Sequence, residues 1–165
     1  MNSNIEQGVK AFLVERLEAT EQFHGSGPER ITITSATIAG KKIQIIAETG
    51  NADVAERLPC LIVRCVDSKI EAADAARQLW LATLEIVVLT PRQAIEWTEA
   101  DHRALVAAAR EQIVPAHLAA IAGALGPFGI ADCNRWFFAG APDEHTKGHW
   151  VTLLRYDPFA FSVTV

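Results

Sequence analysis

Residues 58–101 constrain the fold more than any other part of this chain. They contain two long apolar runs rich in β-branched residues, residues 58–66 and 79–91, joined by a charged segment. Alternation along each run places apolar side chains on a common face, as in a half-buried strand. A capped helix start follows the second run, at Thr98. This order predicts a small sheet with a helix laid across it, and it contains no residue constellation typical of catalysis.

The helix after this block should cover one face of the sheet. Thr98 and Asp101 fit a capping box, and an apolar stripe continues behind them to about Ile113. The residues expected to be buried beneath this helix or within it are Leu84, Ile86, Val88, Leu105, Val106 and Ala109. The other expected elements are a helix over residues 5–22 with Asn4 as its N-cap, a hairpin of strands 30–38 and 43–47, a loop at 48–57, a helical piece from 115 to about 125, and terminal strands 136–138 and 149–156 around the loop 140–148.

Composition narrows the class of protein. With 165 residues, of which 50% are hydrophobic, the chain is long enough for one domain with a real core, and we expect a single domain over residues 1–165. The net charge of −5 argues against a nucleic-acid binder, which needs a basic footprint. There is no apolar run of membrane-spanning length and no basic, apolar start typical of a secretory signal, so we expect synthesis in the cytoplasm and no membrane association.

The three cysteines have no spacing typical of a metal site. Cys60 and Cys65 lie five residues apart on one expected strand, so their side chains should point to opposite faces and cannot form a disulfide. Cys133 needs a histidine base to act as a nucleophile, and no sequence pattern shows that His149 reaches it. We therefore expect buried, reduced, structural thiols.

The polar residues that could carry chemistry fit simpler interpretations. Asp143, Glu144, His145 and His149 cluster near Gly148, but Pro142 and Gly148 predict a solvated loop and not a metal site. His102 lies in the first turn of the expected helix and is interpreted as a surface residue. No catalytic, cofactor-binding or metal-ligating residue is predicted, and no cofactor is expected.

Two segments have the character of contact regions. Residues 67–78 carry five formal charges and form a connection too long for a tight hairpin turn. Within it, residues 72–77 fit either a helical turn or an extended arm. The segment 158–165 is apolar and has no charged side chain. Such a terminus either packs on its own subunit or docks on a partner.

The order of these elements resembles that of the tail terminator, or tail completion, proteins of long-tailed bacteriophages. The resemblance is carried by residues 58–66, 80–91, the helix from Thr98, and 150–161, and it spans the chain from about residue 58 onward, with the N-terminal helix also fitting. It implies an α/β sandwich in which a mixed, mostly antiparallel sheet packs helices on one face. Residues 31–57 are longer than expected for compact members, which leaves open a neighbouring head–tail connector role.

The resemblance implies a structural virion protein and not an enzyme. Its subunits would form a hexameric ring at the head-proximal end of the tail, contact the tail tube protein and the connector proteins, and let DNA pass through an acidic lumen without specific binding. The alternative class is a small cytosolic enzyme or ligand-binding α/β domain that uses Cys133, His145 and His149. The residues expected at subunit interfaces are Asp67, Lys69, Glu71, Asp74, Arg77, Asp143, Glu144, Phe159 and Phe161.

Overall fold

The computed structural model describes residues 2–17, 20–24, 31–38, 41–47, 59–92, 97–140, 143 and 148–164. The side chains of β1 and β2 and a few others within elements lie outside this description. In chain order the elements are α1 (Asn2–Arg16), β1 (Thr20–His24), β2 (Ile31–Ile38), β3 (Lys41–Ala47), β4 (Cys60–Ala73), β5 (Arg77–Pro91), α2 (Glu99–Gln112), the 3₁₀ turn η3 (Pro115–His117), α3 (Leu118–Leu125), the 3₁₀ turn η4 (Gly126–Phe128), β6 (Asp132–Gly140) and β7 (His149–Thr164).

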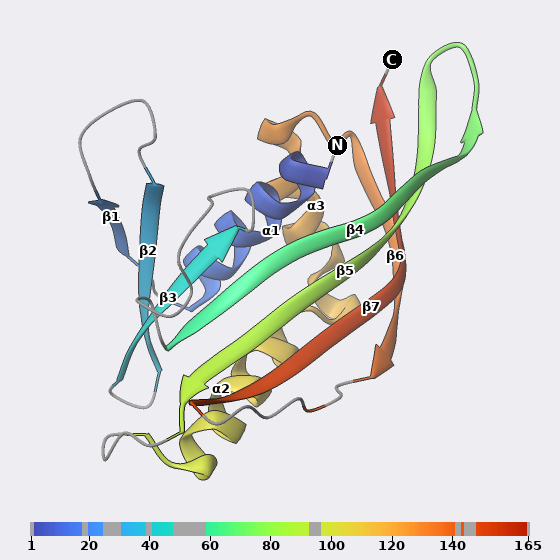
Figure 1. Ribbon diagram of the computed structural model, residues 1–165. Coiled ribbons are helices and arrows are strands. Elements are labelled where there is room, and N and C mark those ends of the chain that lie inside the picture. The colour runs from blue at the N-terminus through green and yellow to red at the C-terminus, as the bar shows by residue number, and fades with distance from the viewer. Residues whose placement is uncertain are drawn as a thin grey trace.

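The described strands form one sheet in the order β1-β2-β3-β4-β5-β7-β6 (Figure 1). The β3–β4 pair is parallel and every other described pair is antiparallel. The predicted mixed, mostly antiparallel sheet is confirmed, and so is the hairpin, in which Ile38 of β2 pairs with Lys41 of β3. The expected loop at residues 48–57 lies outside the described residues.

The helices pack on one face of this sheet, as predicted. α1 contacts β3 and β4, α2 contacts β5 and β7, and α3 packs between α1 and β6. The three predicted sheet residues Leu84, Ile86 and Val88 are fully buried in the core beneath them. Leu105 and Ala109 of α2 are also fully buried, and Val106 packs on the same core at its border. Removing this apolar surface from water is the main stabilising contribution to the layer.

α2 begins with the predicted capping box. The Thr98 hydroxyl accepts a hydrogen bond from the backbone N–H of Asp101 at 3.2 Å, and the Asp101 carboxylate accepts one from the backbone N–H of Thr98 at 3.0 Å. These bonds satisfy two backbone donors that a helix start leaves unpaired. The helix therefore starts where the sequence predicted.

The prediction for the first helix was wrong at both ends. α1 already includes Asn2 and Ser3, so Asn4 is not an N-cap, and it ends at Arg16. Residues 20–24 leave the helix and pair with β2, beginning with Thr20 opposite Ser35. Apolar helical spacing stops at Leu17, because the next large apolar residue, Phe23, lies six positions later and off the same helical face. The backbone of residues 20–24 forms its hydrogen bonds with β2 instead.

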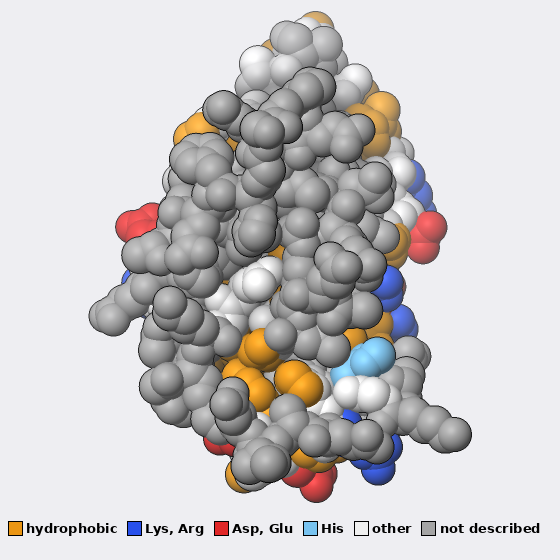
Figure 2. Space-filling view, turned by 60° about the vertical axis from the view of Figure 1, so that its left-hand side comes forward, with side chains coloured by type: hydrophobic (Ala, Val, Ile, Leu, Met, Phe, Trp, Pro, Cys, Tyr) orange, Lys and Arg blue, Asp and Glu red, His pale blue; other side chains and the backbone are white. Residues whose placement is uncertain are grey.

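The opposite face of the sheet is also apolar over part of its area. A second buried cluster there contains Ile46, Cys60, Val87, Leu89, Val151 and Leu153. Cys60 belongs to this cluster and Cys65 to the helix-side core, which confirms that they lie on opposite faces of β4. On the side of the molecule shown in Figure 2, the described acidic and basic side chains lie mainly near the rim of the view.

Candidate functional site

The most prominent feature outside the core is a long hairpin made by the outer halves of β4 and β5, which we call the arm (residues 66–80). It extends past the helix layer at the upper right of Figure 1, with β7 alongside it. The connection predicted at residues 67–78 is therefore not a long loop or a helical turn. β4 continues to Ala73, β5 begins at Arg77, and three residues connect them, so the alternative of an extended arm is the right one.

Asp74 shapes the tip of the arm. Its Oδ1 atom accepts hydrogen bonds from the backbone N–H groups of Ala76 at 2.7 Å and Arg77 at 2.8 Å. These two bonds hold the pKa of the Asp74 carboxyl below its usual value. An aspartate that caps its own turn in this way closes a short connection without a glycine. The sequence reading missed this because it treated Asp74 as one charge in a polar loop.

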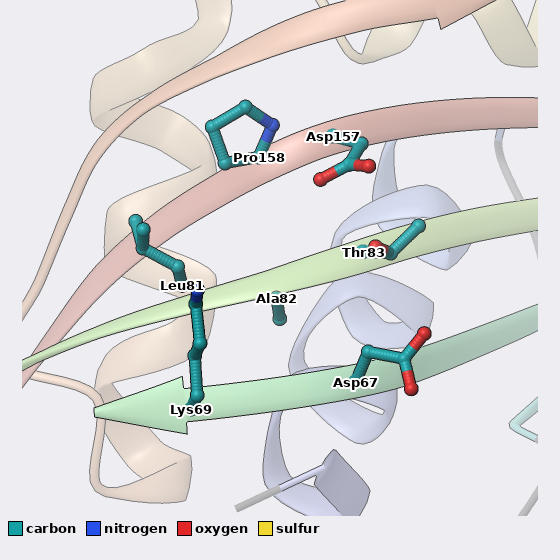
Figure 3. A pocket seen from close by; sticks show the side chains of 7 residues that line it. All are labelled: Asp67, Lys69, Leu81, Ala82, Thr83, Asp157 and Pro158. Atoms are coloured by element: carbon teal, nitrogen blue, oxygen red, sulfur yellow. The ribbon is translucent and has the colours of Figure 1, made fainter. Parts of the chain in front are cut away.

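Irregularities in the strand pairing mark the base of the arm. The register shifts between Val66 and Lys69 on β4 and between Ala82 and Leu84 on β5, and Asp67 has a φ of 51°. Bulges of this kind bend a strand and increase its twist. Between them lies an open hollow of about 370 Å³ (Figure 3), lined by Asp67, Lys69, Leu81, Ala82, Thr83, Asp157 and Pro158.

β7 forms the third strand of the arm and corrects the expectation for the C-terminal segment. Residues 158–164 continue β7, and Arg77 pairs with Thr164. Phe159 and Phe161, expected at an interface, are both 0% exposed in the core of their own subunit. Phe161 stacks on Trp80 with ring centroids 6.2 Å apart. Alternation along a strand sends these aromatic rings toward the helices, so they offer no surface to a neighbour.

The remaining interface candidates have different surroundings. The five charged residues of the arm are exposed, and Ile70 between them is 47% exposed, an unusual position for a large aliphatic side chain. Glu144 lies outside the described residues. The Asp143 carboxylate accepts two hydrogen bonds from Arg103 of α2, at 3.0 and 2.7 Å, and its backbone forms a β-bridge with Thr152 of β7, so Asp143 is held against its own subunit.

His102 is buried, so its interpretation as a surface residue was wrong. Its Nδ1 lies 2.8 Å from Thr90 Oγ1 and its Nε2 lies 2.8 Å from Thr152 Oγ1, on β5 and β7 respectively. The Thr152 hydroxyl donates to Asp143 Oδ1 at 2.6 Å. Position 102 is one turn into α2 and faces the sheet, which the helical period of Leu105 and Ala109 could have shown.

On the sheet face opposite the helices, a carboxylate is held between two arginines. Glu85 is 4% exposed and accepts hydrogen bonds from Arg64 at 3.0 Å and from Arg155 at 3.1 Å. The three residues are direct cross-strand partners on β4, β5 and β7. Burial by itself raises the pKa of Glu85, but the hydrogen bonds and charges of Arg64 and then Arg155 outweigh it and leave this pKa lowered. These charge-assisted hydrogen bonds from Arg64 and Arg155 to Glu85 link β4, β5 and β7.

A second hollow, of about 220 Å³, lies between the end of α2 and the outermost strands. Its lining residues are Arg110, Ile113, Val114, Pro115, Trp136, Phe138 and Tyr156. The Arg110 guanidinium carbon lies 4.2 Å from the ring centroid of Phe138, a cation–π contact. Phe138 is 37% exposed, and the buried Tyr156 hydroxyl has no hydrogen-bond partner among the described residues.

The geometry does not favour the catalytic alternative. Burial and then the charge of Asp132 raise the pKa of Cys133 to about 12, so its thiol is a poor nucleophile at neutral pH. His145 lies outside the described residues. Within the part of the chain that the structure describes, no group of three His, Cys, Asp or Glu residues could hold a metal ion, and no helix is long and apolar enough to cross a membrane.

Comparison with known proteins adds no relative to this picture, because no protein-family description and no curated protein matches the chain. The candidate site therefore rests on the geometry of the arm and of the hollow beside Arg110.

Proposed function

We propose that this protein is a structural ring subunit at the head-proximal end of a bacteriophage tail, where it ends the tail tube and joins it to the head connector. The observation that carries the proposal is the arm, a three-stranded extension that projects beyond the helix layer and exposes Ile70 among charged residues. The tail-end assignment comes from the order of elements that resembles tail terminators.

The arm has the physical properties of an assembly device. An isolated two-stranded hairpin is only marginally stable in water, but β7 supports this one as a third strand. Beyond Val63, no described strand pairs with the outer side of β4. Charged side chains and bulges along this edge oppose uncontrolled edge-to-edge aggregation. The arm is therefore rigid enough to reach a neighbour and protected against unspecific pairing.

Ring formation requires two different surfaces on each subunit, because head-to-tail contacts close into rings. The arm is built from β4, β5 and β7, and the hollow beside Arg110 lies near β6, the last strand of the described order. A stable interface buries about 800 Å² on each partner. The net charge of −5 suits a channel through which DNA slides.

Measuring the mass of the purified protein by light scattering, with electron microscopy of the particles, tests this proposal. We expect rings with a mass six times that of the 18.0 kDa subunit. Replacing residues 71–79 by Asn-Gly keeps the pair between Ile70 and Trp80 and should yield folded monomers. Ala75→Gly, which preserves the length of the arm, is the matched control and should still form rings.

The decisive outcome against the proposal is a wild-type protein that stays monomeric at high concentration and also when mixed with tail tubes. Tail tubes and head connectors, offered separately to the purified ring, distinguish a terminator from an adjacent connector component. A terminator binds the end of the tube, whereas a connector component binds the head side alone.

A further inference from the structure

One of the residues that line the hollow beside Arg110, Tyr156, has a buried hydroxyl whose hydrogen bond is not satisfied by the described residues. Tyr156 is 1% exposed, and within the part of the chain that the structure describes its hydroxyl has no hydrogen-bond partner. Leaving a buried hydroxyl unpaired is unfavourable, and native structures rarely do so without a reason. Burial raises the pKa of Tyr156 to about 12, so the phenol keeps its proton and can donate it. The hollow therefore suits a hydrogen-bond acceptor.

The other lining residues define what kind of acceptor fits. Ile113, Val114, Pro115 and Trp136 provide an apolar wall, and Arg110 provides a positive charge. A matching group presents an aliphatic side chain for the wall and a carboxylate for Arg110 and Tyr156. To fill the hollow together, the aliphatic side chain and the carboxylate must point to nearly the same side of the strand or loop that carries them.

The arm carries this pair at Ile70 and Glu71. Both residues are exposed. Consecutive strand residues normally point to opposite faces, but the register shift between Ile70 and Ala72 makes Glu71 an extra residue opposite the Trp80–Leu79 step. A bulge of this kind breaks the alternation and re-aims side chains.

We propose that the hollow beside Arg110 receives Ile70 and Glu71 from the arm of a second copy of this chain. This inference rests on the proposed ring function and names the contact that closes the ring. The arm of the same chain is not a candidate, because β5 and β7 separate β4 from β6 in the sheet. Three strand spacings amount to roughly 14 Å, and crossing them would break the ladder.

Cysteine cross-linking tests the contact directly. Chains with Ile70→Cys, mixed with chains carrying Val114→Cys, should form covalent dimers under mild oxidation, and a chain with both changes should give covalent ladders up to the full ring. Ala100→Cys replaces Val114→Cys as the control, since Ala100 is exposed and lies about 15 Å along α2 from Arg110. Control mixtures should form no dimers above background.

Charge exchange and hydroxyl removal provide independent readouts. Glu71→Lys and Arg110→Glu should each weaken assembly about tenfold or more, and the double variant should recover most of it. Tyr156→Phe removes the unpaired hydroxyl, so it should leave the stability of the monomer unchanged or higher while assembly weakens. If the Tyr156 hydroxyl had a purely structural role, its removal would change the stability of the monomer and not assembly alone.

The outcomes separate this inference from the function on which it rests. Rings that form normally, without cross-links between positions 70 and 114 and without response to charge exchange, overturn the contact and leave the ring proposal standing. A wild-type chain that never assembles overturns both. If Tyr156→Phe and Arg110→Glu leave assembly intact but abolish binding of a small aliphatic acid such as hexanoate, the hollow is a ligand site and the inference fails.

Discussion

The imidazole of His102 donates from Nε2 to Thr152 Oγ1 across 2.8 Å, and both residues are buried, at 0% and 1% exposure. The direction of this hydrogen bond follows from the hydrogen bond between Thr152 and Asp143, because the Thr152 hydroxyl gives its only proton to the Asp143 carboxylate. Nε2 therefore carries hydrogen, and Nδ1 lies 2.8 Å from the Thr90 hydroxyl. One side chain thus ties α2 to both β5 and β7.

His102→Phe should destabilise the protein strongly. The change leaves the hydroxyl of Thr90 without its ring partner and breaks the chain to Asp143, and each unsatisfied buried group costs about 1–3 kcal/mol. We expect a loss of about 2–5 kcal/mol in the free energy of unfolding, measured by urea denaturation. Glu99→Ala, at an exposed position of the same helix, is the control and should change stability by less than about 0.5 kcal/mol.

Glu85→Gln should remove a pH-dependent part of the stability. Because the pKa of Glu85 is lower in the folded state than in the unfolded chain, its contribution is present above about pH 4.3 and is lost as the pH falls through the folded pKa. At pH 7 we expect a loss of about 1.5–3 kcal/mol, from the weakened bonds to Arg64 and Arg155. The difference in stability between the two proteins should shrink as the pH falls below about 4.3; an equal difference at pH 7 and pH 3 would contradict this account.

Gly8→Ala should destabilise the protein although alanine favours helices. A Cβ atom at position 8 would meet the side chain of Leu125 and lie 3.3 Å from its Cα atom, because α1 and α3 approach closely there. Overpacking costs about 1–3 kcal/mol, against a helix-propensity gain of about 1 kcal/mol. The matched control is Gly123→Ala on α3, where no atom of the described residues lies within 4 Å of the added Cβ, and it should stabilise by about 0.5–1 kcal/mol. Thermal unfolding that ranks the two variants in the opposite order would refute this packing argument.

Phe161→Ala should weaken folding and not only assembly. The ring is fully buried and stacks on Trp80, so its removal leaves a cavity in the core. We expect this change to lower the free energy of unfolding by about 3–5 kcal/mol. Deletion of residues 158–165 should then unfold the subunit instead of leaving a folded monomer, as its far-UV circular dichroism would show. Thr164→Ala, at an exposed position at the end of the same strand, should behave like wild type.

The elements that were predicted correctly depend on short-range patterns. Alternation from Leu84 to Val88 and the helical stripe of Leu105 and Ala109 identify core faces because side-chain direction follows directly from backbone geometry. The capping box at Thr98 needs only residues three positions apart. Such signals lie within one element and do not depend on what packs against it.

The interpretations that failed depended on distant partners. His102 became a core residue because Thr152, fifty positions later in the chain, supplies its acceptor. The end of α1 was misplaced because residues 20–24 pair with β2. The charged residues 67–78 left a helical turn and an extended arm open, and only the pairing of β5 with β7, which extends the strands through them, decides between the two. Tertiary pairing overrides weak local preference in each case.

By itself, the sequence determined that the chain has a half-buried sheet and a capped helix on one face of it, since periodicity and residue type are local properties. Only the tertiary structure decided that Phe159 and Phe161 belong to the core, that the arm projects beside β7, and that Arg110 and Tyr156 share a hollow. These outcomes depend on which strands become neighbours. Strand order is set by burial summed over the whole chain, and no single segment carries that information.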